Sequence, residues 1–577
     1  MNPARARFLS WHCRREWLAA FALTVLVLTL RVGPLAEETA IEALFATAIL
    51  LGLAILLVAV TGRIAFGTVT ACVPLLLLAT AGNLKFQYLS TPLLAPDLLY
   101  YANAEIARTL LRYPFIIAAI VAAAVLVPLI LVFLWRAEGH PPRRPRVRVA
   151  RLVGAAGAMV ALGIVLAPRG PFGQVYAKDA WDAMNDESFI TDFIVSIRNT
   201  HITTPAFRTA DASAADWHDL ASATPVRFRK PDIVAVLEES TFDPRMMTGC
   251  ISRLCDARMF QPDANTIAHG WLNVHTWGGG TWTSEFAFLT GLPHTLFGPA
   301  GTYAPFNLAP RMRYTLPRLL DADGYRTVGI YPTDGDFMNG RTAYTDYGFN
   351  AFYGGTELKL DWGATDAQVF AALERVFAAE KAKADGKPLF VMVLTLYQHG
   401  PHMTPYHELP APYDKALFPG RLAPGHAPLD AWLNLNLTNY LQRLSMSDAA
   451  MTRLEAFLKR DDRPALLVHF GDHQPSFDGA IDHLARRVPA AVPDSHYVTY
   501  YMLKGFNLPI RPERYPVLDI AYLGSLLLDA ADLPRDPFFV ANTLLRDRCA
   551  GQDLDCRNTA LRDSYRAWVF GKLDDLQ

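Results

Sequence analysis

The sequence has little of what marks a nucleic-acid-binding or zinc-finger protein. Its 54 basic and 55 acidic residues nearly cancel, so no basic excess points to nucleic acid. The six cysteines include no Cys-x-x-Cys pair, and the four beyond residue 240 have no histidines at zinc-finger spacing. Charged residues make up only 19% of the 577 residues, while 51% are hydrophobic. This balance is too apolar for an ordinary soluble protein, and the apolar excess lies near the N-terminus.

Charge is also sparse in five apolar runs before residue 170, and we predict that each run is a transmembrane helix. The runs cover residues 17–32, 43–60, 64–83, 113–135 and 152–168. Each approaches the ~20 residues that cross the hydrocarbon core of a bilayer. The first run follows Arg14 and Arg15, a pattern that a signal peptide also shows. The four further runs favour an uncleaved first helix.

The arginines predict which side of the membrane each loop faces. They precede the first run, Arg63 separates the second from the third, and they are dense between the fourth and the fifth, at Arg136, Arg143, Arg144, Arg146, Arg148 and Arg151. Because cytoplasmic loops carry an excess of Lys and Arg, these segments should be cytoplasmic. Five spans then place everything after residue 170 on the outer side.

Four cysteines fall in this predicted outer part, where an oxidising compartment permits disulfides. Four cysteines allow three connectivities. We predict the local one, Cys250 with Cys255 and Cys549 with Cys556, since each pair closes a small loop. Four unpaired thiols are the alternative.

The pattern beyond the last run predicts an α/β domain with a mainly parallel sheet. We expect a membrane domain at 1–169, a linker with short helices at 170–228 and a catalytic domain at 229–577. In the last, short apolar runs at 233–237, 327–331, 389–396 and 465–470 alternate with amphipathic segments, as in βαβ units. Their continuous apolar character is typical of strands that are covered on both faces.

Polar residues follow all four predicted strands directly. The segments are Glu238–Glu239–Ser240, Thr333–Asp334–Gly335, Gln398–His399–Gly400 with His402, and Gly471–Asp472–His473. Ligands of open α/β sheets bind beyond the carboxyl ends of the strands. One such cluster in a loop is usually just solvated, but four of them predict a single converging site.

A glycine-rich stretch, Gly278–Gly279–Gly280–Thr281, precedes a helical pattern. It is either a turn with Thr281 as a simple helix cap, or an approach that holds the Thr281 hydroxyl where a helix N-terminus favours an anion. Glu239, Asp472 and His473 supply two carboxylates and an imidazole, a set that suits Zn²⁺ or Mn²⁺. Thr281 as a fourth ligand would become a nucleophile.

These motifs resemble the alkaline phosphatase/sulfatase superfamily. More narrowly, they resemble its membrane-anchored branch of lipoteichoic acid synthases, periplasmic glucan phosphoglycerol transferases and lipid A phosphoethanolamine transferases. The resemblance implies that Glu239, before Ser240, is a metal ligand, as are Asp472 and His473. It also implies that Thr281, in the segment Thr281–Trp282–Thr283–Ser284–Glu285–Phe286, is both ligand and nucleophile.

The resemblance extends to residues that would bind substrate. Gln398–His399–Gly400–Pro401 is similar to a His-Gly-Pro motif whose histidine contacts the substrate phosphate, so His399 is expected to be catalytic and substrate-binding. His402 is expected to assist as an acid, base or oxyanion partner. Phe337–Met338–Asn339–Gly340–Arg341 resembles a Phe-Trp-Asn-Arg segment. Here Met338 replaces the Trp and one residue is inserted, but Arg341 is still expected to pair with phosphate.

The sequence thus predicts a bacterial cytoplasmic-membrane enzyme, monomeric, with its catalytic domain in the periplasm. It would transfer a phosphoglycerol or phosphoethanolamine head group from a membrane phospholipid to a glycan or glycolipid through a phospho-threonine. Thr283 is the alternative nucleophile, although two helical steps turn it about 200° from Thr281. A metal-dependent hydrolase, a sulfatase that uses Cys250, and a membrane protein with a degenerate site are the alternative functions.

Overall fold

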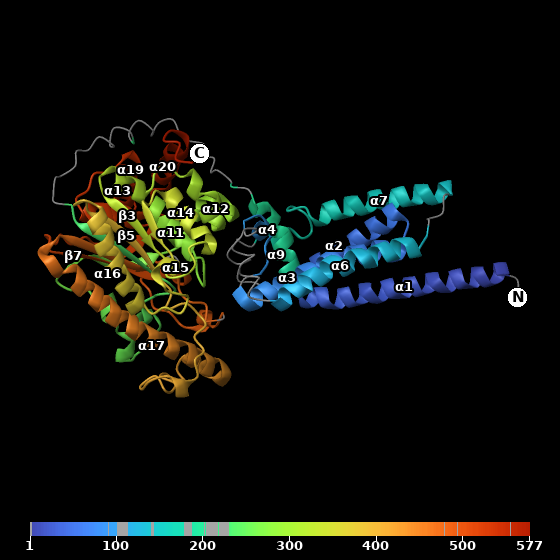
Figure 1. Ribbon diagram of the computed structural model, residues 1–577, viewed down its shortest axis with the longest axis horizontal. Coiled ribbons are helices and arrows are strands. Elements are labelled where there is room, and N and C mark those ends of the chain that lie inside the picture. Colours follow the sequence, from blue (N-terminus) through green and yellow to red (C-terminus); the bar gives the residue numbers. More distant parts are fainter. Residues whose placement is uncertain are drawn as a thin grey trace. The chain divides into compact units, whose positions relative to one another are not determined.

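A computed structural model describes residues 3–89, 92–100, 114–139, 144–177, 187–200, 202, 217, 230–477, 479–492, 494–553 and 556–576 (Figure 1). The chain divides into two compact units, Met1–His201 and Ile202–Gln577. Most of the predicted linker 170–228, part of the loop 84–112, and Arg143 lie outside the described residues.

The first unit consists mainly of long apolar helices. They are α1 (Pro3–Leu35), α2 (Ala40–Thr61), α3 (Ile64–Leu89), α6 (Pro114–Ala137) and α7 (Pro145–Val165), with the short α4 (Ala95–Tyr100) and α9 (Phe189–Val195) beside them. Each long helix contains a segment that is long and apolar enough to cross a membrane. The five predicted spans are therefore confirmed in number and place. The last begins at Pro145 rather than 152, because its arginine-rich first turns are also helical.

Buried carboxylates tie the start of the predicted linker to these helices. Glu37 accepts hydrogen bonds from the backbone amides of Ile190 (3.0 Å) and Thr191 (3.3 Å) at the start of α9. The Ser188 hydroxyl donates to the Glu42 carboxylate at 2.8 Å. These bonds satisfy amides that a helix N-terminus leaves without partners. They explain why α9 belongs to the first compact unit.

The second unit is built on one eight-stranded sheet with the order β4-β3-β5-β1-β6-β7-β2-β8. The strands are β1 (Asp232–Glu238), β2 (Thr266–Asn273), β3 (Arg326–Ile330), β4 (Ala351–Tyr353), β5 (Leu389–Thr395), β6 (Ala465–Gly471), β7 (Val498–Phe506) and β8 (Val517–Asp519). The four predicted strands are β3, β5, β1 and β6, which are neighbours and mutually parallel. Only β7 runs antiparallel to its neighbours. The predicted fold class is confirmed.

Helices cover both faces of the sheet, so its central strands are apolar throughout. One face packs α11 (Thr281–Thr290), α13 (Leu316–Ala322), α14 (Gly340–Tyr347), α18 (Leu523–Ala530), α19 (Pro537–Arg548) and α20 (Thr559–Gly571); the other packs α16 (Asp366–Lys383) and α17 (Ala427–Leu458) (Figure 1). The short α12 (Ala304–Asn307) and α15 (Gly355–Leu358) lie in connections. Along β1, Ile233, Ala235 and Leu237 enter the first core, while Val234 and Val236 enter the second. This alternation follows from the two-residue period of a strand.

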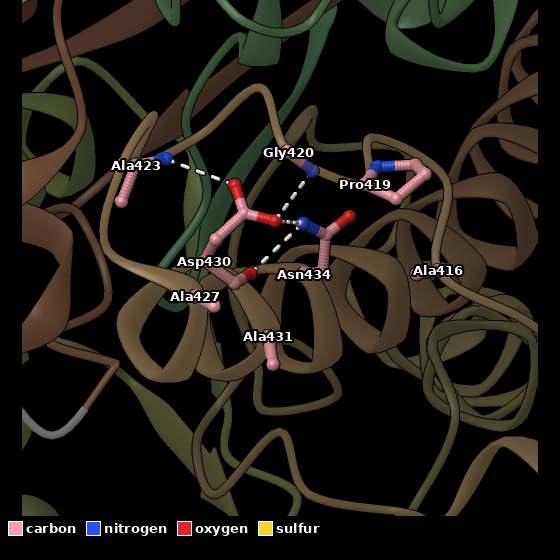
Figure 2. A pocket seen from close by; sticks show the side chains of 9 residues that line it. Ala416, Pro419, Gly420, Ala423, Ala427, Asp430, Ala431 and Asn434 are labelled. Atoms are coloured by element: carbon pink, nitrogen blue, oxygen red, sulfur yellow. Dashed lines mark hydrogen bonds between the residues drawn. The ribbon is translucent and has the colours of Figure 1, made fainter.

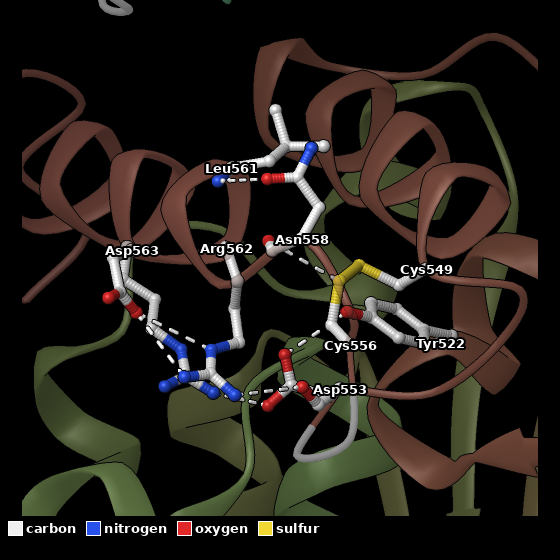
Figure 3. Close-up of a disulfide and its surroundings, with 9 residues drawn as sticks. Tyr522, Cys549, Asp553, Cys556, Asn558, Leu561, Arg562 and Asp563 are labelled. Carbon is white, nitrogen blue, oxygen red and sulfur yellow. Dashed lines mark hydrogen bonds and ion pairs between the residues drawn. A yellow bond between two sulfur atoms is a disulfide. The ribbon is translucent and has the colours of Figure 1, made fainter.

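Both predicted disulfides are present. Cys250 pairs with Cys255 and Cys549 with Cys556, across Cα–Cα distances of 6.0 and 4.8 Å. Figure 3 shows that the second bridge joins the end of α19 to the segment before α20. Within this loop, Asp553 accepts a hydrogen bond from the Tyr522 hydroxyl at 3.1 Å.

Removing the second bridge should destabilise the outer unit. The double change Cys549→Ala and Cys556→Ala opens a loop with a sequence separation of 7. A loop of this size is worth about 2–3 kcal/mol in the chain-entropy account. We expect this double variant, purified in detergent without added oxidant, to have a lower unfolding temperature than the wild type. The matched change Cys250→Ala and Cys255→Ala, with a separation of 5, should cost less. Equal unfolding temperatures for all three proteins would contradict this.

A buried acidic group lies on the second face of the sheet. Asp366, the first residue of α16, is only 2% exposed. Burial, together with the nearby Glu238 carboxyl, raises the pKa of Asp366 to about 7. Burial likewise raises the pKa of Glu238 to about 8. Both carboxyls therefore favour the protonated form inside the fold.

Stability should fall with rising pH because of Asp366. In the unfolded chain the pKa of Asp366 returns to that of an ordinary carboxyl. At pH values between this pKa and the folded pKa, the folded state therefore holds a proton that the unfolded state has lost. Protonated Asp366 contributes its full share to the free energy of unfolding below the unfolded pKa, and this share is lost as pH rises toward 7. It amounts to roughly 4 kcal/mol at most. Asp366→Asn should therefore gain stability over the wild type as pH rises from 4.5 to 8. Unfolding temperatures across this pH range test the prediction, with Asp361→Asn at an exposed position as control. A difference in unfolding temperature between Asp366→Asn and the wild type that stays constant with pH would refute it.

Candidate active site

Three predicted ligands meet at the carboxyl ends of two neighbouring parallel strands. Glu239 follows β1, and Asp472 and His473 follow β6; one ligand atom from each lies within 4.8 Å of the others. His473 Nε2 is 3.1 Å from Asp472 Oδ2 and 3.4 Å from Glu239 Oε1. Among the described residues this is the only group of three such side chains with metal-ligand spacing.

The glycine-rich loop brings Thr281 to this cluster. The Thr281 hydroxyl donates a short hydrogen bond to Glu239 and lies 3.5 Å from His473 Nε2. Gly278 (φ 68°) and Gly280 (φ 85°) adopt the left-handed conformation that side chains disfavour, and α11 begins at Thr281. The Gly278 amide donates to the Gln474 carbonyl at 2.9 Å, which ties the loop to the β6 end. Thr281 thus stands at a helix N-terminus beside the three ligands.

Thr283 lies elsewhere on the helix. Its hydroxyl donates to the Gly280 carbonyl at 2.8 Å, and the side chain is 1% exposed. Neither Thr283 nor Ser284, which donates to the Asp472 carbonyl at 2.7 Å, has its hydroxyl on the cluster. The geometry therefore favours Thr281 over Thr283 as the nucleophile.

Backbone contacts hold the ligands in place. One Asp472 oxygen accepts from the amides of Ser240 and His473, both at 2.7 Å. Ser240 takes a positive φ of 51° to make this contact, a strained conformation for a residue other than glycine. At Gly471 a Cβ atom would lie 1.8 Å from the Thr241 carbonyl oxygen, so only glycine permits the approach of the two strand ends.

The arrangement fits a divalent cation. His473 Nδ1 faces the Gln474 carbonyl at 2.9 Å, so the proton of a neutral ring sits there and Nε2 is left to coordinate. Asp472 Oδ2 is buried with no hydrogen-bond partner. Burial and the Glu239 carboxylate raise the pKa of Asp472 to about 8. Against the opposing effect of burial, the two carboxylates raise the pKa of His473 to about 9. A bound Zn²⁺ or Mn²⁺ would replace those protons.

His399 follows β5, the parallel neighbour of β1 on the side away from β6. Against the effect of burial, His473, His399 and the Thr281 hydroxyl lower the pKa of Glu239 to about 2. His399 Nδ1 faces the Gly400 carbonyl at 2.7 Å, which leaves Nε2 as the second ring position for a ligand. Arg443 of α17 donates to the carbonyls of His399 (2.7 Å) and Pro401 (2.9 Å) and so fixes this loop.

Arg341 lies at the start of α14, where the connection after β3 ends. Its guanidinium is 2.7 Å from Glu357 and stacks over Phe352 at 5.0 Å. The side chain is 39% exposed, so it remains accessible to a ligand. A phosphate or hydroxyl group would bind there in competition with Glu357.

His402 does not share this exposed setting. It is 1% exposed and packs against the rings of Tyr440 (5.7 Å) and Phe477 (5.3 Å). Burial lowers its pKa to about 3, so the ring stays neutral. The predicted substrate contact of His402 is not supported by this geometry, because the turn after His399 directs the side chain into an aromatic cluster.

Several supporting residues were not among the predicted site residues. Ser284, Gln474 and Arg443 act through hydrogen bonds to backbone carbonyls, for which the sequence carries no spacing signal. Trp362 contacts the His399 ring at a centroid distance of 4.8 Å. It lies in an irregular connection, 37 positions from His399, so only the fold brings the two rings together.

A separate hollow lies at the start of α17. Figure 2 shows this cavity of about 410 Å³, lined mainly by small residues of 416–431 and by Asn434. Asp430 in its wall already accepts from the amides of Gly420, Leu422 and Ala423 at 2.6 to 3.0 Å. The lining includes none of the predicted site residues, and its one carboxylate is used to hold the loop.

Known proteins resemble parts of this chain. Residues 231–506 match the protein family described as Sulfatase. An uncharacterized protein of Haemophilus influenzae is 30% identical over 60% of this chain and 61% of its own length. A putative cyclic beta-1,2-glucan modification protein of Rhizobium meliloti is 24% identical over 68% of this chain and 60% of its own. The chain thus spans about three fifths of the length of these two curated relatives.

The fold also occurs among solved structures. Streptococcus pyogenes phosphoglycerol transferase GacH, in complex with sn-glycerol-1-phosphate, superposes with a TM-score of 0.50. It is 18% identical, and the match covers 64% of this chain and 94% of that one. At this identity the similarity establishes the shared fold.

Loss of a predicted ligand should weaken metal binding without unfolding the domain. His473→Gln removes the nitrogen around which both carboxylates gather, and we expect at least a tenfold lower affinity for Zn²⁺ and Mn²⁺. Metal content after dialysis against each ion, measured by elemental analysis, tests this. His483→Gln, a change at an exposed histidine, is the matched control. Equal metal content in both variants would remove the site from consideration.

Proposed function

We propose, from the premise that residues 231–506 form a sulfatase-family domain, that this integral membrane protein is a phosphotransferase. It takes the head group of a membrane phospholipid and transfers it to an extracytoplasmic glycan or glycolipid. The observation that supports this best is the Thr281 hydroxyl, which is hydrogen-bonded to Glu239 at the N-terminus of α11. The nucleophile Thr281, its activating carboxylate Glu239 and a helix N-terminus that favours an anion are then next to one another.

Glu239, Asp472, His473 and Thr281 would hold the cation. When bound, a Zn²⁺ or Mn²⁺ ion polarises phosphate oxygens and lowers the pKa of a coordinated hydroxyl. The α11 N-terminus offers backbone amides to the phosphate, and the dipole of the helix favours the negative charge. His399, at the edge of the cluster, would donate a hydrogen bond to the transferred phosphate.

In the first step, the Thr281 hydroxyl gives its proton to Glu239, the carboxylate to which it is hydrogen-bonded, and Thr281 Oγ attacks the phosphorus of the donor phosphodiester. The bond from phosphorus to the diacylglycerol oxygen breaks, and that oxygen takes up a proton from His399, the predicted acid. The product is a phospho-threonine that carries the head group. Diacylglycerol stays in the membrane.

In the second step, a hydroxyl of the acceptor attacks the same phosphorus. The bond from phosphorus to Thr281 Oγ breaks, and the acceptor hydroxyl gives its proton to His399, which now acts as the base. Thr281 Oγ takes back a proton from Glu239, and the threonine is restored. The two steps form a ping-pong sequence in which donor and acceptor use one site in turn. If water takes the second step, the protein is a phosphodiesterase instead.

The nature of the substrates rests on the relatives. A phosphoglycerol transferase shares the fold, and a relative is described as a putative modification protein of a cyclic glucan. We therefore place phosphoglycerol first, phosphoethanolamine second, and a periplasmic glucan or glycolipid as acceptor. The two disulfides and the five spans support a bacterial inner-membrane protein whose catalytic domain faces the periplasm, and we propose that it acts as a monomer. A sulfatase that uses Cys250 is disfavoured, since that residue is in a disulfide.

Mass spectrometry of the Thr281 peptide should reveal the intermediate. Full-length protein with Mn²⁺ or Zn²⁺ and phosphatidylglycerol vesicles should gain the mass of phosphoglycerol on Thr281. Thr281→Ala should lose the adduct and at least 10³-fold in transfer rate, because the nucleophile is gone. Thr281→Ser keeps a hydroxyl and should retain part of the activity.

Thr283→Ala is the control for this experiment. Its hydroxyl serves only the Gly280 carbonyl, so the adduct on Thr281 should persist. Supplying a glycan acceptor separates transferase from hydrolase, since only a transferase gives a glycosylated phosphoglycerol product. Full activity of Thr281→Ala would refute the proposed mechanism.

A further inference from the structure

Three rings from separate segments meet on the β3–β5 side of the metal cluster. The Trp362 indole contacts the His399 imidazole at 4.8 Å between ring centroids and the Phe337 ring at 5.3 Å, both edge to face. Phe337 follows β3, and His399 follows β5. Because these strands are parallel neighbours, their carboxyl ends open on the same edge of the sheet as β1.

In the described part of this domain the exposed large hydrophobic side chains are Ile251, Trp362, Met403 and Met446, and Trp362 is the largest of them. Trp362 is 39% exposed, although two of its sides are covered by the other rings. Exposing apolar surface of this size has a free-energy cost that a surface loop can avoid with a polar residue. The exposed part of the Trp362 ring is therefore apolar surface that a ligand would cover favourably.

The segment 337–341 does not supply this aromatic surface itself. Met338 stands where the resembling family carries a tryptophan, and it is 7% exposed, with a positive φ of 49°. Its side chain thus points into the protein, and the backbone there turns sharply. Residue 338 is not aromatic, so the ring that packs against Phe337 comes from elsewhere. It is Trp362, from the connection before α16.

The three rings come from segments that reach both the cluster and Arg341. On the inner side, His399 follows β5, the parallel neighbour of β1, after which Glu239 lies. On the outer side, Arg341 stacks on Phe352 and pairs with Glu357 at 2.7 Å. A head group attached to a phosphate at the cluster would extend from the inner side toward Arg341. It would pass along the indole.

We propose that Trp362 is a substrate-binding residue that forms the wall of the head-group pocket. This inference rests on the proposed function and names the part of the substrate that Trp362 contacts. The methylene groups of a two- or three-carbon alcohol on a phosphodiester pack on the indole, while Arg341 and Glu357 take its terminal polar group. Phosphoglycerol and phosphoethanolamine share this chemistry, and the Arg341–Glu357 pair offers a donor and an acceptor to either terminal group.

Steady-state kinetics of the full-length protein in mixed vesicles test the role. The variants are Trp362→Ala and Trp362→Phe, and the donors are phosphatidylglycerol and phosphatidylethanolamine. Trp432→Ala, the same change at a half-buried position of α17 outside the three-ring contact, is the control. Metal content and unfolding temperature are measured for each variant.

We expect Trp362→Ala to raise KM for the preferred donor about tenfold, equivalent to about 1.4 kcal/mol, with kcat changed less than about threefold. Trp362→Phe should restore most of the loss, because a ring surface is regained. The control should match the wild type. Competition by sn-glycerol-1-phosphate should weaken in Trp362→Ala by the same factor as the donor.

Three results would overturn the assignment. They are an unchanged KM in Trp362→Ala, a loss confined to kcat, and no rescue by Trp362→Phe with normal metal content and stability. These results differ from a failure of the proposed function, in which the wild type itself neither transfers a head group nor forms the Thr281 adduct. A Trp362→Ala protein that unfolds leaves Trp362→Phe to decide, since it keeps the ring contacts with Phe337 and His399.

Discussion

Two buried carboxylates held against one imidazole are the constraint on which the second unit depends. Glu239 is 3% exposed, and Asp472 is not exposed at all. Like charges so close together and so far from water are unfavourable unless a cation or a proton joins them. The backbone amides of Ser240 and His473 satisfy only one oxygen of Asp472, and Oδ2 has no hydrogen-bond partner. The cluster thus has the donor atoms and the unbalanced negative charge that a divalent cation would complete.

The strained backbone around the site follows from that constraint. Strands β1 and β6 must end close enough for their side chains to share one ion, which requires glycine at 471 and a positive φ at Ser240. The loop that carries Thr281 needs left-handed glycines at 278 and 280. Strain of this kind persists only where surrounding structure outweighs it. Here the hydrogen-bonded ladder between β1 and β6, buried on both faces, supplies that structure.

The sequence predicted the parts of the site that lie on regular structure. The continuous apolar runs gave β1, β3, β5 and β6, and their ends carry Glu239, His399, Asp472 and His473. Strands β2 and β7 were not predicted, because His269 and Gly270 interrupt one and Lys504 the other. Lys504 is 1% exposed and pairs with Glu455 at 2.7 Å, a partner that no local pattern reveals. When only the sequence is known, a lysine in a strand is interpreted as an exposed residue, even where it is buried in an ion pair.

The parts that the sequence could not place depend on irregular connections. His402 lies three residues from His399, yet a Gly–Pro turn sends one ring inward and leaves the other beside the cluster. Trp362 reaches His399 only through the order of strands in the sheet. Since helical and strand periods do not apply in such segments, side-chain direction there is set by the tertiary fold.

In the proposed function, the five candidate spans keep the catalytic domain on the membrane that contains its lipid donor. A phospholipid donor is confined to a two-dimensional layer, and a domain on the same chain as five candidate spans cannot diffuse away from that layer. Linkage of this kind converts an encounter in solution into one at high effective concentration. In the proposed mechanism, a covalent intermediate on Thr281 carries the small polar group out of the lipid phase while diacylglycerol stays behind. The proposed pocket, with Trp362 as its wall, would then need to recognise only the part of the lipid that leaves the membrane.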